Sequence, residues 1–176
     1  LQSLDAVCDG ELEGLLTLPK VAAVGEIGLD YYWNKAPKEL QMKAFEIQLQ
    51  LAAKAGLPVI VHNREASQDT LSILTDWHSG LKSSYPNLAK YPGVMHSFSG
   101  TIEEALFVIE MGFLIGITGP VTYKKAVDLQ NLVTVLPLES LLVETDAPFL
   151  TPHPMRGKRN EPSYLKITTE KIAELR

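Results

Sequence analysis

The chain has 176 residues, of which 45% are hydrophobic and 21% charged, and its formal net charge is −5. This length and composition suffice for the core of one domain and carry no signature of intrinsic disorder. The net negative charge argues against a broad electrostatic grip on nucleic acid, although it is compatible with a local phosphate site. We therefore expect a folded domain that would hold any nucleic acid locally.

Cysteine usage and hydropathy indicate the cellular compartment in which the protein is expected. The chain has one cysteine, Cys8, which excludes a disulfide framework, a thiolate zinc cluster and a dithiol redox pair, and favours a reducing compartment. The first residues lack the basic flank and apolar core of a signal peptide, and no apolar stretch approaches the ~20 residues needed to span a membrane. The sequence therefore predicts a cytoplasmic protein with no membrane partner.

Strand-like and helix-like segments alternate along the chain. A helix is expected from Glu11 to Leu18, ahead of the first strand. The predicted strands are mainly apolar runs at residues 21–27, 57–62, 93–97, 113–117 and 141–146. The predicted helices cover residues 38–55, 67–78, 101–112, 124–136 and about 163 onward. No linker or convincing repeat interrupts these five βα units.

Short signals mark several helix ends. Gly56 is placed to end the first long helix as a C-cap. Thr101 and Glu104 form a capping box at the start of a later helix, which Gly112 closes. Pro137 stops the helix after that.

Five βα units leave two α/β architectures open. An eightfold barrel typically needs ~250 residues, more than this chain has, whereas a doubly wound sheet tolerates two unpaired edges. The chain also opens in a predicted helix and ends in mid-helix at Arg176. We therefore expect residues 1–176 to form one domain that is incomplete.

Four of the apolar runs end on or close to a side chain that can bind a divalent metal: Glu26, His62, His96 and Asp146. The carboxyl ends of parallel strands meet at one rim, where α/β enzymes carry out their chemistry. Imidazole and carboxylate together suit zinc, manganese and similar ions. A single strand-end histidine is more often structural, and Glu26 alone could cap a turn, but the four together indicate a metallohydrolase.

Two charged residues near these ligands each have two interpretations. Arg64 lies two positions beyond a strand-end histidine, where it could hold a phosphate oxygen; an ion pair with Glu65 or Asp69 is the alternative. Glu144 lies two residues before Asp146, on the same face of a regular strand. It could steady the ligands from behind, or form a salt bridge in the mouth of a barrel.

A basic loop follows the last predicted strand. It carries Arg156, Lys158 and Arg159 at a place where barrels commonly bind phosphate. The alternative is a solvated loop, and Asn160 is expected to brace it rather than to touch substrate.

Aromatic and histidine residues elsewhere have weaker assignments. Tyr31, Tyr32 and Trp33 follow the first strand and could stack on nucleobases, or could form a lid over the core. His78 is expected on the surface. His153 is a weak second candidate ligand.

Six blocks carry a resemblance to a known family: Gly25-Glu-Ile-Gly-Leu-Asp-Tyr-Tyr32, Val61-His-Asn-Arg64, His96-Ser-Phe-Ser-Gly100, Ile117-Thr-Gly-Pro-Val-Thr-Tyr123, Glu144-Thr-Asp-Ala-Pro-Phe-Leu150 and Arg156-Gly-Lys-Arg-Asn-Glu-Pro162. In this order, over nearly the whole chain, they resemble the TatD-type metal-dependent deoxyribonucleases. The resemblance implies a distorted TIM barrel, usually two divalent ions, and hydrolysis of phosphodiester bonds, often by removing nucleotides from DNA ends.

The resemblance also implies individual roles. Glu26 would bridge two metal ions, His62 and His96 would hold one of them, and Asp146 would hold the other. The family opens with a strand that ends in His-x-His, followed by two more strands, and none of these has a counterpart here. We therefore expect the chain to cover strands four to eight of a longer protein.

The sequence thus predicts a TIM-barrel-type α/β hydrolase with about five of the eight βα units. It would be a deoxyribonuclease, and we expect an exonuclease that acts on single-stranded DNA or DNA ends through a water activated by one or two Zn, Mn or Mg ions. The expected catalytic residues are Glu26, Asp146 and Arg64, and the expected substrate-binding residues are Arg64, Tyr31, Arg156, Lys158 and Arg159. Two alternatives are an amidohydrolase or esterase acting on a carbonyl substrate, and a non-catalytic remnant without the His-x-His ligands.

Overall fold

Two units, each with its own buried core, make up the described part of the chain. The computed structural model describes residues 11–33 and 35–176, so Cys8 and the start of the chain lie outside the described residues. The first unit runs to Val94 and includes Met111–Phe113, and the second comprises Met95–Glu110 and Leu114–Arg176. The strands are arranged in chain order, β1-β2-β3-β4-β5, and β3 (Gly93–Met95) contributes residues to both units.

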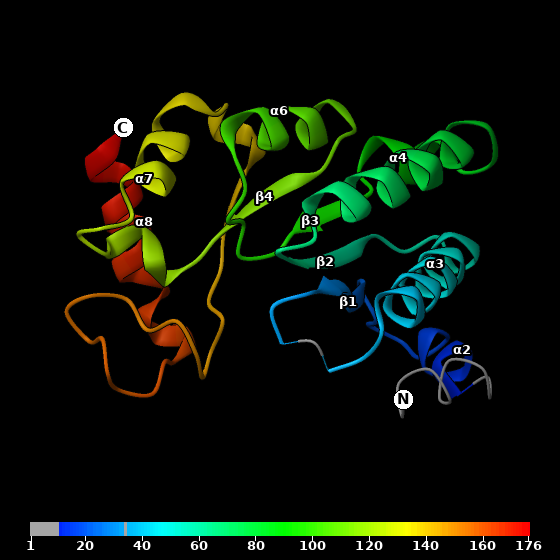
Figure 1. Cartoon of the computed structure of the whole chain (residues 1–176), viewed down its shortest axis with the longest axis horizontal. Coiled ribbons are helices and arrows are strands. Elements are labelled where there is room, and N and C mark those ends of the chain that lie inside the picture. Colours follow the sequence, from blue (N-terminus) through cyan, green and yellow to red (C-terminus); the bar gives the residue numbers. More distant parts are fainter. Residues whose placement is uncertain (1–10, 34) are drawn as a thin grey trace. The chain divides into compact units, whose positions relative to one another are not determined.

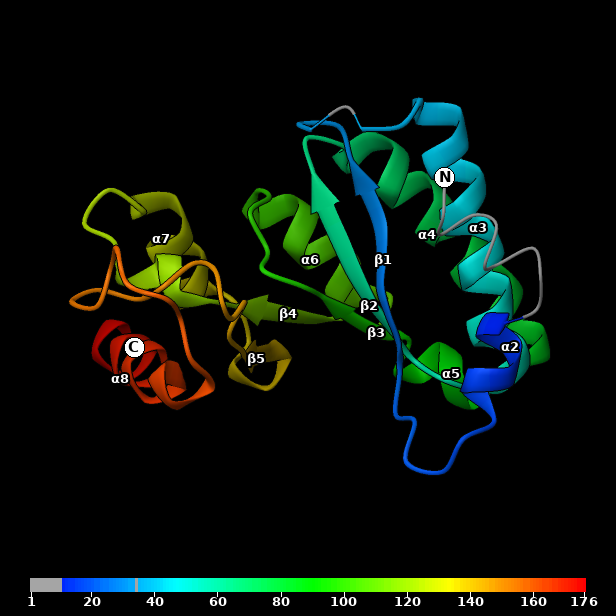
Figure 2. The ribbon, with the colours of Figure 1, turned by 90° about the horizontal axis from the view of Figure 1, so that it is seen from below.

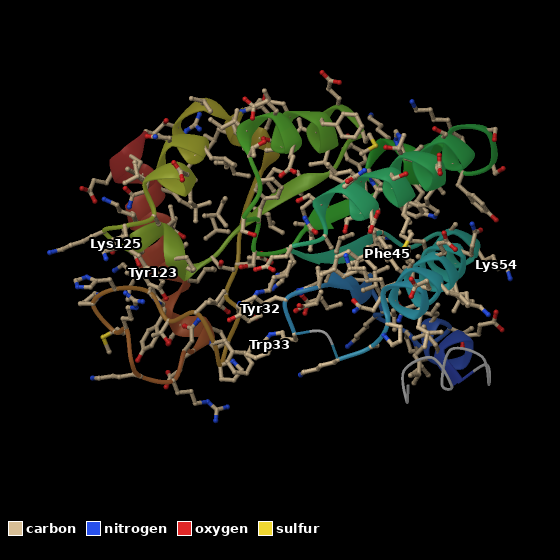
Figure 3. The ribbon with its side chains drawn as sticks, in the orientation of Figure 1. Tyr32, Trp33, Phe45, Lys54, Tyr123 and Lys125 are labelled. Carbon is tan, nitrogen blue, oxygen red and sulfur yellow. The ribbon has the colours of Figure 1, made fainter. Side chains whose placement is uncertain are left out.

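In the first unit, two parallel strands carry two long helices on one side (Figure 1 and Figure 2). The strands are β1 (Val24–Asp30) and β2 (Val59–Arg64), and the helices are α3 (Lys38–Ala55) and α4 (Ser67–Ser84). Two short helices, α2 (Glu11–Leu16) and α5 (Pro86–Lys90), complete the unit. Its largest fully buried side chains come from strands and helices alike: Leu29, Phe45, Leu49, Val59, Leu74 and Phe113. Figure 3 labels Phe45 on α3 and Lys54 at the outer end of that helix.

α3 covers the residues that the sequence predicts. Pro37 precedes it, and its carbonyl oxygen accepts the N–H groups of Leu40 and Gln41. Gly56 ends it at φ 67°, where the Gly56 N–H donates to the carbonyls of Ala52 and Ala53. Glycine adopts this left-handed conformation without a Cβ clash, so the predicted C-cap is confirmed.

α4 is longer than predicted, and α5 occupies a segment expected to be a loop. The predicted end at residue 78 is too early. Leu81 is 2% exposed, and its burial favours continuation of the helix. The surface prediction for His78 is wrong. This side chain is 5% exposed, and its Nε2 lies 2.9 Å from the Ala89 carbonyl oxygen. Since a carbonyl only accepts, Nε2–H is the donor, and the bond joins α4 to α5.

β1 starts and ends later than predicted, so Glu26 lies inside the strand rather than at its end. Val24 pairs with Val59 and Ile27 pairs with Val61, so β1 contains one more residue than β2 in this stretch. A bulge of this kind interrupts the alternation of strand faces. Val24 and Ile27 are both buried, and Glu26 is exposed on the other face.

In the second unit, the parallel strands β4 (Leu114–Ile117) and β5 (Leu141–Val143) pack with three helices. The helices are α6 (Ile102–Glu110), α7 (Val127–Val135) and α8 (Leu165–Leu175), and α7 and α8 lie side by side (Figure 1 and Figure 2). Turns of 3-10 helix occur at η1 (Gly119–Thr122), η2 (Leu138–Ser140) and η3 (Pro162–Tyr164). The core is apolar and comes from β4, the three helices and η1: Ala105, Val108, Ile115, Ile117, Val121, Leu132, Val133 and Ile172.

The predicted capping box of α6 is confirmed. The Thr101 N–H donates to Glu104 Oε2 at 2.9 Å, and the Glu104 N–H donates to Thr101 Oγ1 at 3.2 Å. The strand predicted at 141–146 ends early, at Val143. None of the helices described here combines the length and the apolar composition needed to cross a membrane.

Candidate functional site

In the first unit, the imidazole of His62 lies between two carboxylates. Its Nδ1 is 2.9 Å from Glu26 Oε1, and its Nε2 is 3.1 Å from Asp30 Oδ2. Strand register explains the arrangement. Gly28 of β1 pairs with His62 of β2, and Glu26 and Asp30 lie two residues before and after Gly28, on the same face.

Gly28 keeps the space beside His62 open. Its φ is 140°, a conformation that other residues rarely adopt, and a Cβ at this position would collide with the His62 backbone oxygen. Glycine is therefore required for both reasons. No side chain then lies between Glu26 and Asp30 along the strand.

The charges of this cluster favour an ionised network. The hydrogen bond with Glu26 raises the pKa of His62, although burial of the ring acts in the opposite direction. Burial would raise the pKa of Asp30, but hydrogen bonds from the Trp33 N–H and from His62 outweigh it, so the pKa of Asp30 is lowered. The Asp30 carboxylate therefore persists beside the ring near neutral pH.

In the second unit, His96 also lies between two carboxylates. Its Nδ1 is 2.9 Å from Glu144 Oε2, and its Nε2 is 3.6 Å from Asp146 Oδ1. The His96 side chain is 12% exposed, against 35% for His62. The second cluster is therefore the more shielded from water.

Backbone bonds place the residues of the second cluster. His96 directly follows β3, and the Phe98 N–H donates to the Gly116 carbonyl of β4 at 2.9 Å. Glu144 directly follows β5, and its N–H donates to the Ile117 carbonyl at 3.1 Å. Because β5 ends before Glu144, the prediction that a regular strand holds Glu144 and Asp146 on one face does not apply. The two carboxylates instead contact opposite nitrogens of one ring.

The donor set fits a divalent ion in its chemistry. Imidazole nitrogen with carboxylate oxygen is the combination that zinc and manganese accept. Within residues 11–33 and 35–176, however, no three His, Cys, Asp or Glu side chains converge as a group able to hold a metal ion. In both clusters the carboxylates flank opposite nitrogens of a ring rather than converge. The assignment of Glu26, His62, His96 and Asp146 as ligands stays a prediction.

Arg64 stacks on aromatic side chains of the loop after β1. Its guanidinium carbon lies 3.9 Å from the Tyr32 ring centre and 5.5 Å from that of Trp33. The two rings meet edge to face, with centroids 4.9 Å apart. Both side chains are labelled in Figure 3. Both aromatic side chains are at least half exposed. This exposure argues against a lid over the core.

Tyr31 is oriented differently from its two neighbours. Its hydroxyl donates to Asp69 Oδ2 of α4 at 2.7 Å, and Lys38 Nζ lies 4.1 Å from its ring centre. Burial and the bond to Asp69 raise the pKa of Tyr31 to about 12. These contacts favour a structural role for Tyr31. They also show that the partner of Asp69 is Tyr31, whereas an ion pair with Arg64 was the alternative considered from the sequence.

The basic loop of the second unit is held at several points. Asn160 is 2% exposed, its side chain donates to the Phe149 carbonyl, and its N–H donates to the Pro148 carbonyl. The predicted bracing role of Asn160 is confirmed. Arg156 lies with its guanidinium carbon 4.4 Å from the centre of the Tyr123 ring.

The other two cations of this loop, Lys158 and Arg159, are exposed, as is His153. Two contact residues were missed at the level of sequence, Asp30 and Tyr123. Asp30 could have been found from its position, since residues four apart in one strand, such as Glu26 and Asp30, lie on the same face. For Tyr123 the sequence offered no such signal.

The chain belongs to the TatD related DNase family, whose model matches residues 4–176. The resemblance seen in the sequence is thus confirmed. Among curated relatives, the uncharacterized metal-dependent hydrolase YabD of Bacillus subtilis is 46% identical over 157 residues, which is 89% of this chain and 58% of YabD. The 3'-5' ssDNA/RNA exonuclease TatD of Erwinia billingiae is 40% identical over 171 residues, 94% of this chain and 62% of that protein.

Solved structures agree with this assignment. The structure of YjjV, a TatD homolog from Escherichia coli, superposes on this chain with a TM-score of 0.84 at 34% sequence identity. The match covers 94% of this chain and 61% of YjjV. A TatD family hydrolase from Entamoeba histolytica gives a TM-score of 0.78 at 26% identity, covering 98% of this chain and 64% of that one. The predicted α/β fold of the TIM-barrel-type hydrolases is confirmed. The chain spans less than two thirds of the length of these relatives.

Proposed function

We propose that the protein is a divalent-metal-dependent phosphodiesterase that removes nucleotides from the ends of single-stranded DNA. Membership of the TatD related DNase family supports the reaction class. The name of the Erwinia relative, a 3'-5' ssDNA/RNA exonuclease, supports the substrate and the polarity. With a single cysteine and its acidic composition, the protein would act in a reducing, cytoplasmic setting.

The proposed metal ligands are Glu26 and His62 in the first unit and His96 and Asp146 in the second. The spacing of the last two carries the proposal. His96 Nε2 lies 3.6 Å from Asp146 Oδ1, whereas two ligands joined to one ion by ~2.1 Å bonds at a tetrahedral angle are roughly 3.4 Å apart. This spacing is too long for a strong hydrogen bond and suits two ligands of one ion. It thus differs from the arrangement implied by the resemblance, in which His96 and Asp146 hold different ions.

When bound, a divalent ion supplies Lewis acidity to a phosphodiester and makes water more acidic. Asp146, whose side chain is 32% exposed, would accept the proton of the attacking water. Arg64 would offset charge on the phosphate through the N–H edge of its guanidinium, since stacking on Tyr32 occupies only the flat face. Lys158 and Arg159 would attract the strand electrostatically.

The test compares this chain with a version extended by the N-terminal part of the Bacillus subtilis relative, each with and without His96→Asn. Bound metal and nucleotide release from short single-stranded DNA are measured. We expect the extended protein to release nucleotides from the 3' end, and His96→Asn to lower both metal content and rate by at least about 100-fold.

Three outcomes would change the proposal. Metal binding with intact DNA would favour a carbonyl substrate. Absence of both metal and turnover in the extended protein would favour the non-catalytic alternative. Unchanged cleavage in His96→Asn would remove His96 from the site.

A further inference from the structure

The carboxylate of Glu144 accepts from two directions at once. Its Oε1 accepts the backbone N–H of Ser97 at 2.6 Å, and its Oε2 lies 2.9 Å from His96 Nδ1. The side chains of His96 and Glu144 are 12% and 17% exposed, so water competes weakly for these bonds. The Glu144 carboxylate therefore contacts both the His96 ring and the backbone of Ser97.

These bonds determine which ring nitrogen carries the proton. A backbone N–H can only donate, and an ionised carboxylate can only accept. His96 Nδ1 must therefore donate to Glu144, and in the neutral imidazole the lone pair then lies on Nε2. Nε2 is the nitrogen on the Asp146 side of the ring.

We propose that Glu144 is a positioning residue that fixes the tautomer and the orientation of His96, so that the lone pair of the neutral ring lies on Nε2, the nitrogen that a divalent ion would bind. The part of this inference that concerns metal rests on the proposed function. The part that concerns the tautomer does not, because it follows from the contacts of Glu144 alone.

Gly116 of β4 provides the space for this arrangement. A Cβ at Gly116 would collide with Glu144 Oε1 and would lie 2.8 Å from Glu144 Cδ. The φ of Gly116 is not in the left-handed region, so glycine is required here for space alone. Gly116→Ala is thus a second way to disturb Glu144 without touching its charge.

Glu144→Gln is the decisive variant because it keeps the shape of the side chain. The amide oxygen must face the Ser97 N–H, since two donors repel each other, so the amide NH2 faces His96 Nδ1. That nitrogen would then have to accept, and the ring proton would move to Nε2. Glutamine thus reverses the tautomer, and the nitrogen available to metal is blocked by a proton.

The tautomer is measured by long-range ¹H–¹⁵N NMR of the metal-free protein at a pH where the ring is neutral, with His96 peaks assigned from their loss in His96→Asn. We expect the Nδ1–H form in the wild type and the Nε2–H form in Glu144→Gln. Titration with Mn²⁺ or Zn²⁺ should show about a 10- to 100-fold weaker affinity in the variant. Glu139→Gln, an exposed residue of the same unit, is the matched control and should change neither.

An Nε2–H ring in the wild type, or an Nδ1–H ring in a folded Glu144→Gln protein, would overturn the proposal. If Glu144→Gln does not fold, the His96 tautomer is measured in Gly116→Ala instead. The proposal predicts a mixture of both tautomers in that variant, and a ring that stays entirely in the Nδ1–H form would refute it. A third outcome is that both proteins show the expected tautomers but neither binds metal. This outcome would support the positioning role of Glu144 and refute the proposed metal function.

Discussion

The guanidinium of Arg64 lies over the Tyr32 ring, with its central carbon 3.9 Å from the ring centre. Arg64 ends β2 and Tyr32 follows β1, so the contact joins the ends of two paired strands. A stacked guanidinium is held in one orientation, and its N–H groups still point outward in the ring plane. The pair is therefore suited to present a fixed fork of donors to a phosphate.

Arg64→Lys should raise KM for short single-stranded DNA by about tenfold, because lysine keeps the charge but lacks the planar stack and the bidentate fork. Arg64→Ala should raise it further. Lys54→Ala, which removes an exposed cation on α3 of the same unit (Figure 3), is the control. An unchanged KM in Arg64→Lys would mean that Arg64 acts only as a charge or has no contact with substrate.

Tyr31→Phe should lower the free energy of unfolding by about 1 kcal/mol without changing KM, because its hydroxyl bonds to Asp69. Urea unfolding and steady-state kinetics separate the two effects. A rise in KM at unchanged stability would instead support the substrate-binding role predicted from the sequence.

The ionisation of Tyr31 gives a pH dependence with a defined sign. Its pKa is raised to about 12 in the folded protein, against roughly 10 in an unfolded chain. The stabilisation is therefore fully present below about pH 10 and is lost as the pH rises through about 12. Burial also raises the pKa of Tyr123, so absorbance titration should show more than one tyrosine that ionises late. Tyr31→Phe should remove one late ionisation, and Asp69→Asn should shift that one downward.

Trp77 joins α4 to α3 inside the first unit. Its Nε1–H donates to the Leu49 carbonyl at 3.0 Å, and its ring lies 6.5 Å from that of Phe113. Trp77→Phe should cost about 1–2 kcal/mol through loss of the bond and of ring volume, and Trp77→Ala about 3–5 kcal/mol. Equal stabilities of the two variants by urea unfolding would contradict this packing.

Metal binding should raise thermal stability if the proposed ligands are right. A site that is filled at 100 times its Kd stabilises the folded state by about 2.7 kcal/mol, which is roughly 5–10 °C in Tm for a chain of this size. His96→Asn should abolish the shift produced by Mn²⁺ or Zn²⁺, and addition of a chelator should reverse it. His153→Asn removes an exposed histidine of the same unit and should preserve the shift.

The basic loop can be tested by salt. If Lys158 and Arg159 each contact one phosphate of a single strand, each alanine variant should reduce the slope of log K against log salt by about 0.7. Lys166→Ala, an exposed cation on α8 that pairs with Glu170 at 3.7 Å, should leave the slope unchanged. Identical slopes in all variants would favour the solvated-loop interpretation.

Most of the element order could be predicted from the sequence because it depends on local signals. The Gly56 C-cap and the Thr101–Glu104 capping box act within a few residues, and both are confirmed. His78 was misplaced because its burial depends on a partner, Ala89, that lies on another helix. The continuation of α4 escaped prediction for the same reason.

The candidate site shows a similar division. The chemical types of His62 and His96 were sufficient to single them out, but the carboxylates that contact them depend on strand register and loop geometry. Asp30 contacts His62 because His62 pairs with Gly28, two residues before Asp30, across the two strands. Such pairings are set by the fold as a whole and cannot be inferred from residue spacing alone.

The extra residue of β1 has a consequence for any attempt to shorten or redesign this strand. If one residue between Val24 and Ile27 were deleted, Val24 would still lie opposite Val59 and Ile27 opposite Val61, because the deleted residue is the extra one of the bulge. A deletion after Ile27 has no extra residue to absorb it, so Leu29 and Asp30 would each move to the other face of the strand. We therefore expect β1 to tolerate shortening at residue 25 far better than at residue 28.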